Sequence, residues 1–200
     1  MDSISNYKNR ALDTLKGNWA DAAISTIIYS VLIAAAPVCL SGVTFGFETL
    51  WSLAMIPLEW GFAIMFLMLV RGEKLDISRM FDGYKDFLRI FCTMLLQKVY
   101  IFLWSLLLII PGIIKAFSYA MTSYILKDNP EIKNNEAIEK SMQMMQGHKM
   151  DLFLLYLSFI GWAILSVITL GIGFIFLTPY VNAAVSHFYE DLKEEAQPLI

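Results

Sequence analysis

Charged residues are scarce in this sequence. Only 16% of its 200 residues are Asp, Glu, Lys or Arg, 58% are hydrophobic, and the mean hydropathy is +0.59. In soluble domains about a quarter of the residues are charged. A membrane-spanning helix needs about 20 mostly apolar residues, and such segments fill most of the chain. The composition therefore excludes an ordinary soluble domain and predicts a membrane protein.

Cysteine and histidine are also few, with two of each. Cys39 and Cys92 fall near opposite ends of their predicted helices, which would hold them too far apart to bridge. His148 and His187 have no Cys or carboxylate at metal-ligand spacing. The sequence contains no Gly-x-Ser-x-Gly, no phosphate loop and no paired acids within an apolar segment. We therefore expect free thiols, no metal site, no cofactor and no catalytic residues, so not an enzyme.

The first residues do not resemble a cleavable signal peptide, and the chain has no large charge of one sign. Its first eighteen residues are polar and contain no short apolar core that ends in small residues. The first apolar segment is therefore expected to target the protein to the membrane. The net charge is only −3, which argues against nucleic acid as a partner.

Long apolar runs, in contrast, are abundant, and they predict six transmembrane helices. Phe91 to Leu126 read as one helix would extend roughly 54 Å, against a hydrocarbon core of about 30 Å, so the chain must turn at Pro111-Gly112. The predicted spans are Trp19 to Leu40, Leu50 to Val70, Phe91 to Ile110, Gly112 to Leu126, Asp151 to Leu170 and Gly171 to Tyr189.

Charge placement predicts the orientation. Thirteen of the fifteen Lys and Arg precede span one, separate spans two and three or spans four and five, or follow span six. By the positive-inside rule these segments and both termini are cytoplasmic. The outer tips are then Ser41 to Thr49, Pro111-Gly112 and Leu170-Gly171. Sixteen of the eighteen acids lie on the same inner face, so that face is not the polybasic patch that binds anionic lipid surfaces.

A repeat accompanies this topology. Before each odd-numbered span, apolar residues recur at three- and four-residue steps, which is typical of an amphipathic helix at the membrane interface. The sequence thus predicts a single all-α membrane domain over residues 1–200. It consists of three units, 1–72, 73–128 and 129–193, each an interfacial helix followed by a two-span hairpin.

The first and third units match most closely, with Gly17 over Gly147 and Asp21 over Asp151. Glycine can take the left-handed conformation that ends a helix. Asn18 can cap the next helix, and an acid in the first turn suits the positive end of the helix dipole. Asn18, Asp21 and Asp151 are therefore the predicted helix-start residues.

Ionisable residues within a bilayer are candidate functional groups. Glu59 and Lys115 each follow a proline that opens an even-numbered span, so both are expected near the outer end of the bundle. They could form an ion pair, Lys115 could bind an anionic group, or each could extend to the interface.

The even-numbered spans also carry polar residues that could line a cavity: Ser118, Tyr119, Thr122, Tyr180 and Asn182. Discontinuous helices near Pro and Gly are where transporters bind substrates. Helix packing through small residues and interhelical hydrogen bonds explains the same composition. Both interpretations stay open at the level of the sequence.

Four stretches resemble a known family: "LKGNW" near the start, "LWSLLLIIPGIIKAFSYAMTSYILKDNP" at Leu103 to Pro130, "EAIEKSMQMMQGHK" at Glu136 to Lys149, and "LSFIGWAILSVITLGIGFIFLTPYVNAAVSHFYEDL" at Leu157 to Leu192. Together they resemble the bacterial integral-membrane family called domain of unknown function 975 over nearly the whole chain. The resemblance implies a multi-span bacterial membrane protein and assigns no activity.

Two classes of function follow. In the first, the protein is a non-catalytic component of the bacterial cytoplasmic membrane that organises lipid or partner proteins, a second copy of itself among them. In the second, it is a small permease or channel with a path between the even-numbered spans. The scarcity of intramembrane charge favours the first class, because coupled transport needs buried ionisable groups.

Overall fold

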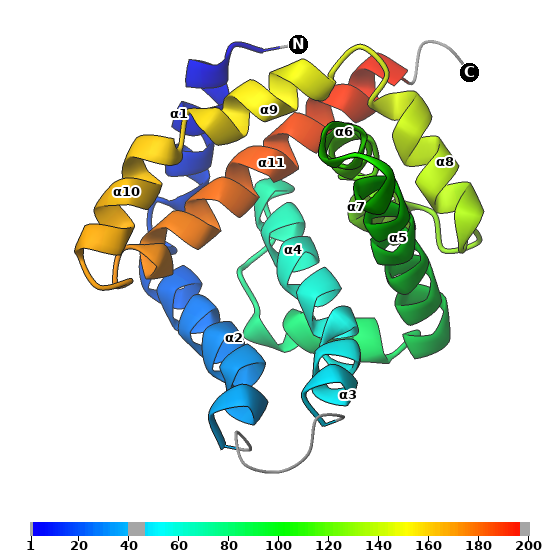
Figure 1. Ribbon diagram of the computed structural model, residues 1–200. Helices are drawn as coiled ribbons and strands as arrows, with labels where there is room; N and C mark the ends of the chain where they lie inside the picture. The colour runs from blue at the N-terminus through cyan, green and yellow to red at the C-terminus, as the bar shows by residue number, and fades with distance from the viewer. Residues whose placement is uncertain (1, 40–46, 197–200) are drawn as a thin grey trace.

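The computed structural model describes residues 2–39 and 47–196, and this part of the chain is helical throughout, without strands. The bundle is shown in Figure 1, where the start of α1 and the end of α11 lie at the same end. The helices are α1 Ile4–Leu15, α2 Trp19–Cys39, α3 Phe47–Ala54, α4 Ile56–Val70, the 3₁₀ helix η1 Ile77–Tyr84, α5 Phe87–Leu107, α6 Ile109–Ser118, α7 Thr122–Asp128, α8 Asn135–Met144, α9 Lys149–Leu157, α10 Ile160–Ile168 and α11 Phe174–Ala196.

Four helical segments of the described chain are long and apolar enough to cross a membrane: Thr49–Val70, Phe87–Leu107, Ile109–Asp128 and Lys149–Ile168. A fifth is added if α1 and the start of α2, which meet at 96°, count as one broken span. The structure therefore supports an all-helical protein with several apolar segments of spanning length. It yields four or five such segments where the sequence predicted six.

Helix α4 forms the centre of the bundle. Nearly all its side chains are buried, among them Phe62, Phe66 and Leu67, because it is apolar on every face and a helix of that kind is stable only when surrounded. Tyr29 of α2 stacks on Phe62, with ring centroids 4.3 Å apart. The C-terminal half of α11 packs against α4 and buries Phe188 and Tyr189.

The three short polar helices pack on other helices of the bundle, α1 on one that is distant in sequence, and η1 and α8 on ones that directly precede them. In α1, Arg10 bonds Asp191 of α11 at 2.8 Å, and the rings of Tyr7 and Phe188 lie 5.5 Å apart. Helix α8 packs on the α6–α7 junction. The third, η1, crosses the start of α4 so closely that the backbones of the two elements touch.

The contact between η1 and α4 depends on two glycines. A Cβ atom on Gly61 of α4 would lie 2.1 Å from the carbonyl oxygen of Met80, and one on Gly83 of η1 would lie 2.2 Å from that of Pro57. Both neighbours are backbone atoms, which cannot rotate away as a flexible side chain can. Only glycine therefore allows the two elements to approach this far.

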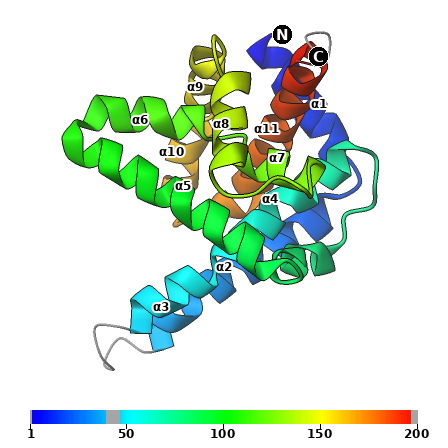
Figure 2. The same cartoon turned by 90° about the vertical axis from the view of Figure 1, so that its right-hand side faces the viewer.

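The turn between α5 and α6 lies earlier than predicted. The chain reverses at Leu108, whose backbone is extended, and α6 begins at Ile109. Pro111 and Gly112 thus lie in the first turn of α6, where proline is tolerated because its missing N–H would have no partner inside the helix. Figure 2 shows the α5–α6 pair projecting sideways from the bundle. The predicted tip at 41–49 falls largely outside the described residues.

The matched junctions α1–α2 and α8–α9 share one geometry. Gly17 and Gly147 have φ of 86° and 90°, and the next amide bonds the residue two before the glycine: Asn18 N to Leu15 O at 2.8 Å, His148 N to Met145 O at 3.2 Å. The Asn18 side chain, however, donates back to Thr14 O at 3.3 Å. The sequence had predicted that Asn18 caps the start of α2. Its side chain instead bonds the end of α1.

Asp21 and Asp151 lie in the first turns of α2 and α9. The Asp151 carboxylate is 3.4 Å from Nδ1 of His148. An acid at this end of a helix interacts favourably with the helix dipole.

Candidate functional site

The most highly connected polar site joins the ends of the three central helices α4, α7 and α11. We call Arg71, Asp128, Tyr189, Glu190 and Lys193 the helix-end cluster. Arg71 follows the last residue of α4, and both its terminal nitrogens donate to Asp128 at 2.7 Å. Arg71 Nε donates to Glu190 at 2.8 Å. Asp128 also accepts from the Tyr189 hydroxyl at 2.9 Å and from Lys193 at 2.6 Å.

The charges in this cluster depend on one another. Asp128 is the last residue of α7, where the helix dipole disfavours an anion, and its side chain is only 10% exposed. Two cations and a hydroxyl compensate that carboxylate. In return, the hydrogen bond to Asp128, together with Glu190, raises the pKa of Arg71 above its usual value. The cluster therefore fixes how the three helix ends meet.

Sequence reasoning missed this site. It counted Arg71 and Lys193 among the cations that set the topology and assigned no role to Asp128. The available signal was an acid that ends an apolar helix, which is unfavourable unless a cation lies nearby. The identity of that cation depends on how the helices converge.

Ser118, Tyr119 and Thr122 lie at a break between α6 and α7, and all three are buried. Ser141 of α8 joins the two sides of the break: its hydroxyl donates to Ser118 O at 2.9 Å and accepts from the Met121 amide at 3.2 Å. The Ser118 and Thr122 hydroxyls bond carbonyls of their own segment. Groups that a ligand could bind at a discontinuous helix are thus bonded within the protein.

The two predicted cavity residues of α11 lie apart from that break. Asn182 donates to Thr178 O of its own helix at 2.9 Å. Tyr180 packs edge-on against Phe159, with centroids 4.9 Å apart, and lines an apolar groove. The five residues therefore divide between two places, the break at α6–α7 and the wall of that groove.

Glu59 and Lys115 do not form the ion pair that was one of the three alternatives from the sequence. Glu59 accepts a hydrogen bond from Lys98 of α5 at 2.7 Å, with both side chains close to half exposed. The Lys115 ammonium lies 5.0 Å above the ring of Trp104 and 5.7 Å from that of Tyr119. Helix α5 packs directly on α4 and brings Lys98 to Glu59. Lys115 turns into its own hairpin, where aromatic faces stabilise the cation.

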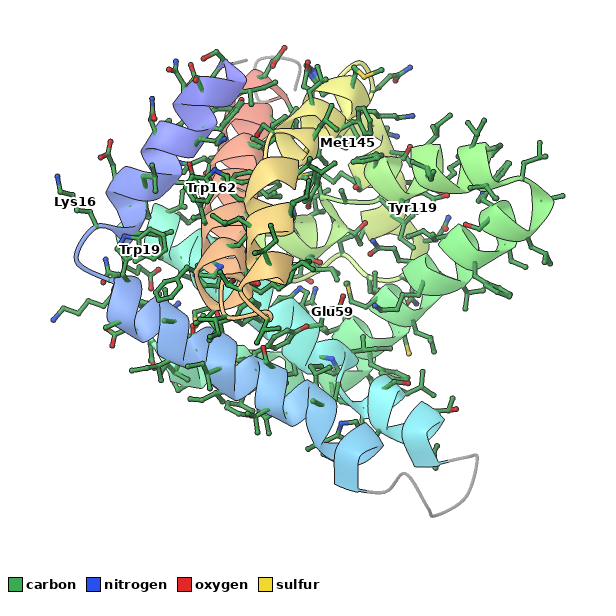
Figure 3. All side chains as sticks on the ribbon, turned by 60° about the vertical axis from the view of Figure 1, so that its left-hand side comes forward. Lys16, Trp19, Glu59, Tyr119, Met145 and Trp162 are labelled. Carbon is green, nitrogen blue, oxygen red and sulfur yellow. The ribbon has the colours of Figure 1, made fainter. Side chains whose placement is uncertain are left out.

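Two apolar grooves open on the outside of the bundle. One, of about 460 Å³, lies between α6 and the start of α9. The other, of about 370 Å³, lies between α10, α11 and the α1–α2 junction. Trp19 and Trp162, labelled in Figure 3, line the second groove from α2 and α10. Both volumes are in the range of small-molecule sites, about 300–1,000 Å³.

The described residues contain no group of three or more His, Cys, Asp or Glu that could hold a metal ion. Cys92 is a free, exposed thiol, and the side chain of Cys39 lies outside the described ones.

Comparison with known families supports the resemblance seen in the sequence. The family described as "Protein of unknown function (DUF975)" matches residues 106–196. Over this segment the chain is therefore similar to the DUF975 family. No curated protein and no solved structure matches the chain.

The DUF975 match covers just under half of the chain, whereas the sequence resemblance was traced over nearly all of it. The DUF975 segment includes α6 to α11, the groove between α6 and α9, and every member of the helix-end cluster except Arg71. The family description assigns no activity, so the residues of this segment take their roles from geometry alone.

Proposed function

We propose that this DUF975 protein is a non-catalytic, multi-pass component of the bacterial cytoplasmic membrane that organises lipid around itself. In this proposal the chain crosses the bilayer six times as three hairpin units, with both termini cytoplasmic. The observation that carries it is the distribution of apolar surface. Large hydrophobic side chains are exposed along α2, α5, α6 and α10, for example Val31, Leu106, Ile110 and Val167 at 61–74%, a surface that acyl chains would cover.

The polar groups support the same proposal. Those at the helix break and in the helix-end cluster are bonded within the protein. The groove between α6 and α9, in contrast, is apolar and opens outward between helices of spanning length. Such an arrangement favours contact with lipid tails over chemistry on a polar substrate.

The topology is tested by thiol labelling in intact cells. Starting from a variant with Cys39 and Cys92 replaced by serine, Leu170→Cys is expected to react with an impermeant reagent, because Leu170 lies at a proposed outer tip and is 95% exposed. Lys85→Cys, whose side chain is 81% exposed on the proposed inner face, is expected to react only after permeabilisation. Reaction of Lys85→Cys in intact cells would overturn the orientation.

Lipid binding is tested directly by mass spectrometry. The protein is extracted in polymer-bounded discs of native bilayer, transferred to mild detergent, and analysed for retained phospholipid. We expect phospholipid to remain bound to the folded, monodisperse protein. A folded protein that carries none would contradict the proposed function.

A permease remains the second candidate, because Glu59 and Lys98 are an ionisable pair on two segments of spanning length. We expect proteoliposomes of the protein to show no proton or ion flux above that of protein-free vesicles. A flux that Glu59→Gln abolishes, and that the surface control Glu73→Gln leaves intact, would favour the permease.

A further inference from the structure

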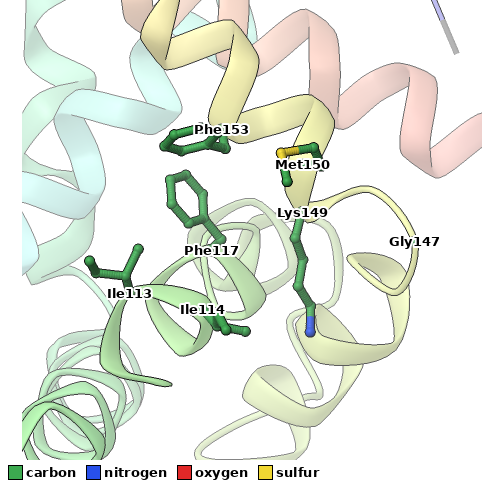
Figure 4. A pocket seen from close by; sticks show the side chains of 7 residues that line it. All are labelled: Ile113, Ile114, Phe117, Gly147, Lys149, Met150 and Phe153. Atoms are coloured by element: carbon green, nitrogen blue, oxygen red, sulfur yellow. The ribbon is translucent and has the colours of Figure 1, made fainter. Parts of the chain in front are cut away.

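The groove between α6 and α9 combines an apolar interior with a single charge. Its lining consists of Ile113, Ile114, Phe117, Gly147, Lys149, Met150 and Phe153. Figure 4 shows Phe117 and Phe153 facing each other across the groove, and their rings meet edge to face with centroids 5.8 Å apart. Ile113 and Ile114 belong to α6, and Met150 to α9. An occupant must therefore be apolar over most of its length.

Lys149 supplies the charge at one end of the groove. It is the first residue of α9, is half-buried, and has no ion-pair partner within 4 Å among the described side chains. The nearest acid in sequence, Asp151, pairs with His148 instead. At Gly147, which also lines the groove, no atom lies within 4 Å of where a Cβ would stand, so this part of the groove is open. The groove complements a molecule with an apolar tail and one anionic group.

The helices that form the groove also set the depth of that charge. Both belong to segments of spanning length, Ile109–Asp128 and Lys149–Ile168. Lys149 is the first residue of the second segment, so its ammonium lies at one end of that segment, and Phe153 lies one helical turn further along it. This order matches a phospholipid, with phosphate at the interface and chains below it.

The first unit offers an internal comparison. The match of Gly17 to Gly147 places Trp19 at the position of Lys149, and Trp19 lines the second groove. At corresponding positions, the groove between α6 and α9 thus carries the cation of Lys149, and the second groove carries the aromatic ring of Trp19. The preference for an anion should belong to the first groove alone.

We propose that the groove between α6 and α9 binds an anionic phospholipid, with an acyl chain against Phe117 and Phe153 and the phosphate bonded to the Lys149 ammonium. The proposal rests on the proposed membrane location and names the ligand of that function. Because the predicted inner face as a whole has a net charge near −3, the preference arises from this one site and not from general surface attraction.

The test measures binding of phosphatidylglycerol and phosphatidylcholine with identical acyl chains to the full-length protein in detergent, by native mass spectrometry. We expect wild type to prefer phosphatidylglycerol, Lys149→Ala and Lys149→Trp to lower that preference roughly 10-fold, and Lys149→Arg to retain it. Phe153→Ala is expected to weaken both lipids alike. Inorganic phosphate is not expected to compete, because it lacks the apolar tail.

Lys16→Ala is the matched control, since it removes the same charge from an exposed position outside the groove. A preference that survives Lys149→Ala, or falls equally in Lys16→Ala, would overturn the proposal. So would occupation of the groove by a second copy, seen as a dimer that resists added lipid and is lost in Phe153→Ala. Binding of both lipids without charge preference would refute this inference alone, whereas absence of any bound lipid would refute the proposed function as well.

Discussion

Replacing Gly61 with alanine is expected to destabilise the protein by about 3 kcal/mol, the upper end of the usual cost of overpacking. The new Cβ would overlap the carbonyl oxygen of Met80, 2.1 Å away, and nothing but a shift of backbone could relieve that contact. Gly83→Ala should cost as much, because its Cβ would meet Pro57 O at 2.2 Å in the same interface. Thermal unfolding in detergent, followed by fluorescence-detected size exclusion, measures both effects.

Gly161→Ala is the control for this prediction. Gly161 lies in helix α10 and has no atom within 4 Å of the added Cβ. Alanine there should be neutral or stabilising by about 0.5–1 kcal/mol, because it lowers the entropy of the unfolded chain and favours the helix. If Gly61→Ala and Gly161→Ala unfolded at the same temperature, η1 could not cross α4 as closely as described.

Replacing Asp128 with asparagine is the second change with a large expected effect, about 3 kcal/mol of lost stability. The substitution keeps the shape of the side chain but removes the charge that binds Arg71 and Lys193, and breaking a buried ion pair leaves its partner uncompensated. The pair of Asp82 and Lys85, whose lysine side chain is 81% exposed, provides the control. Asp82→Asn should change stability by no more than about 0.5 kcal/mol.

A double-mutant cycle distinguishes a shared interaction from two separate losses. Arg71→Ala and Asp128→Ala together should cost less than the sum of the single variants by about 1–3 kcal/mol, since each removes the same contact. Strict additivity, measured by the same unfolding assay, would mean that the bidentate contact between Arg71 and Asp128 contributes nothing to stability.

The pattern of apolar residues along the sequence predicted where most of the long apolar helices begin and end to within a few residues. The apolar run at Phe91 to Ile110 corresponds to α5 at Phe87–Leu107, and the run after it to α6 and α7, because apolar length is a property of the chain itself. The α5–α6 turn was misplaced at Pro111. Proline lacks an amide hydrogen, which fits a first helical turn as well as a loop, so the sequence could not separate the two.

Pairings between helices could not be predicted in this way. Depth in the bilayer suggested Lys115 as the partner of Glu59, but the partner is set by which helix lies beside α4, and that is α5 with Lys98. The helix-end cluster likewise joins residues from three distant segments. Hydropathy and spacing describe one helix at a time, whereas these contacts depend on how helices converge.

The packing of α1 on α11 has a consequence for synthesis on the ribosome. Tyr7 and Arg10 of α1 contact Phe188 and Asp191 of α11, a helix that begins about 160 residues after α1 ends. At roughly 5–20 residues per second, that interval lasts roughly 8 to 30 s. During this time the nascent chain presents an uncovered α1, and a chain truncated before α11 would present it permanently to proteases and chaperones.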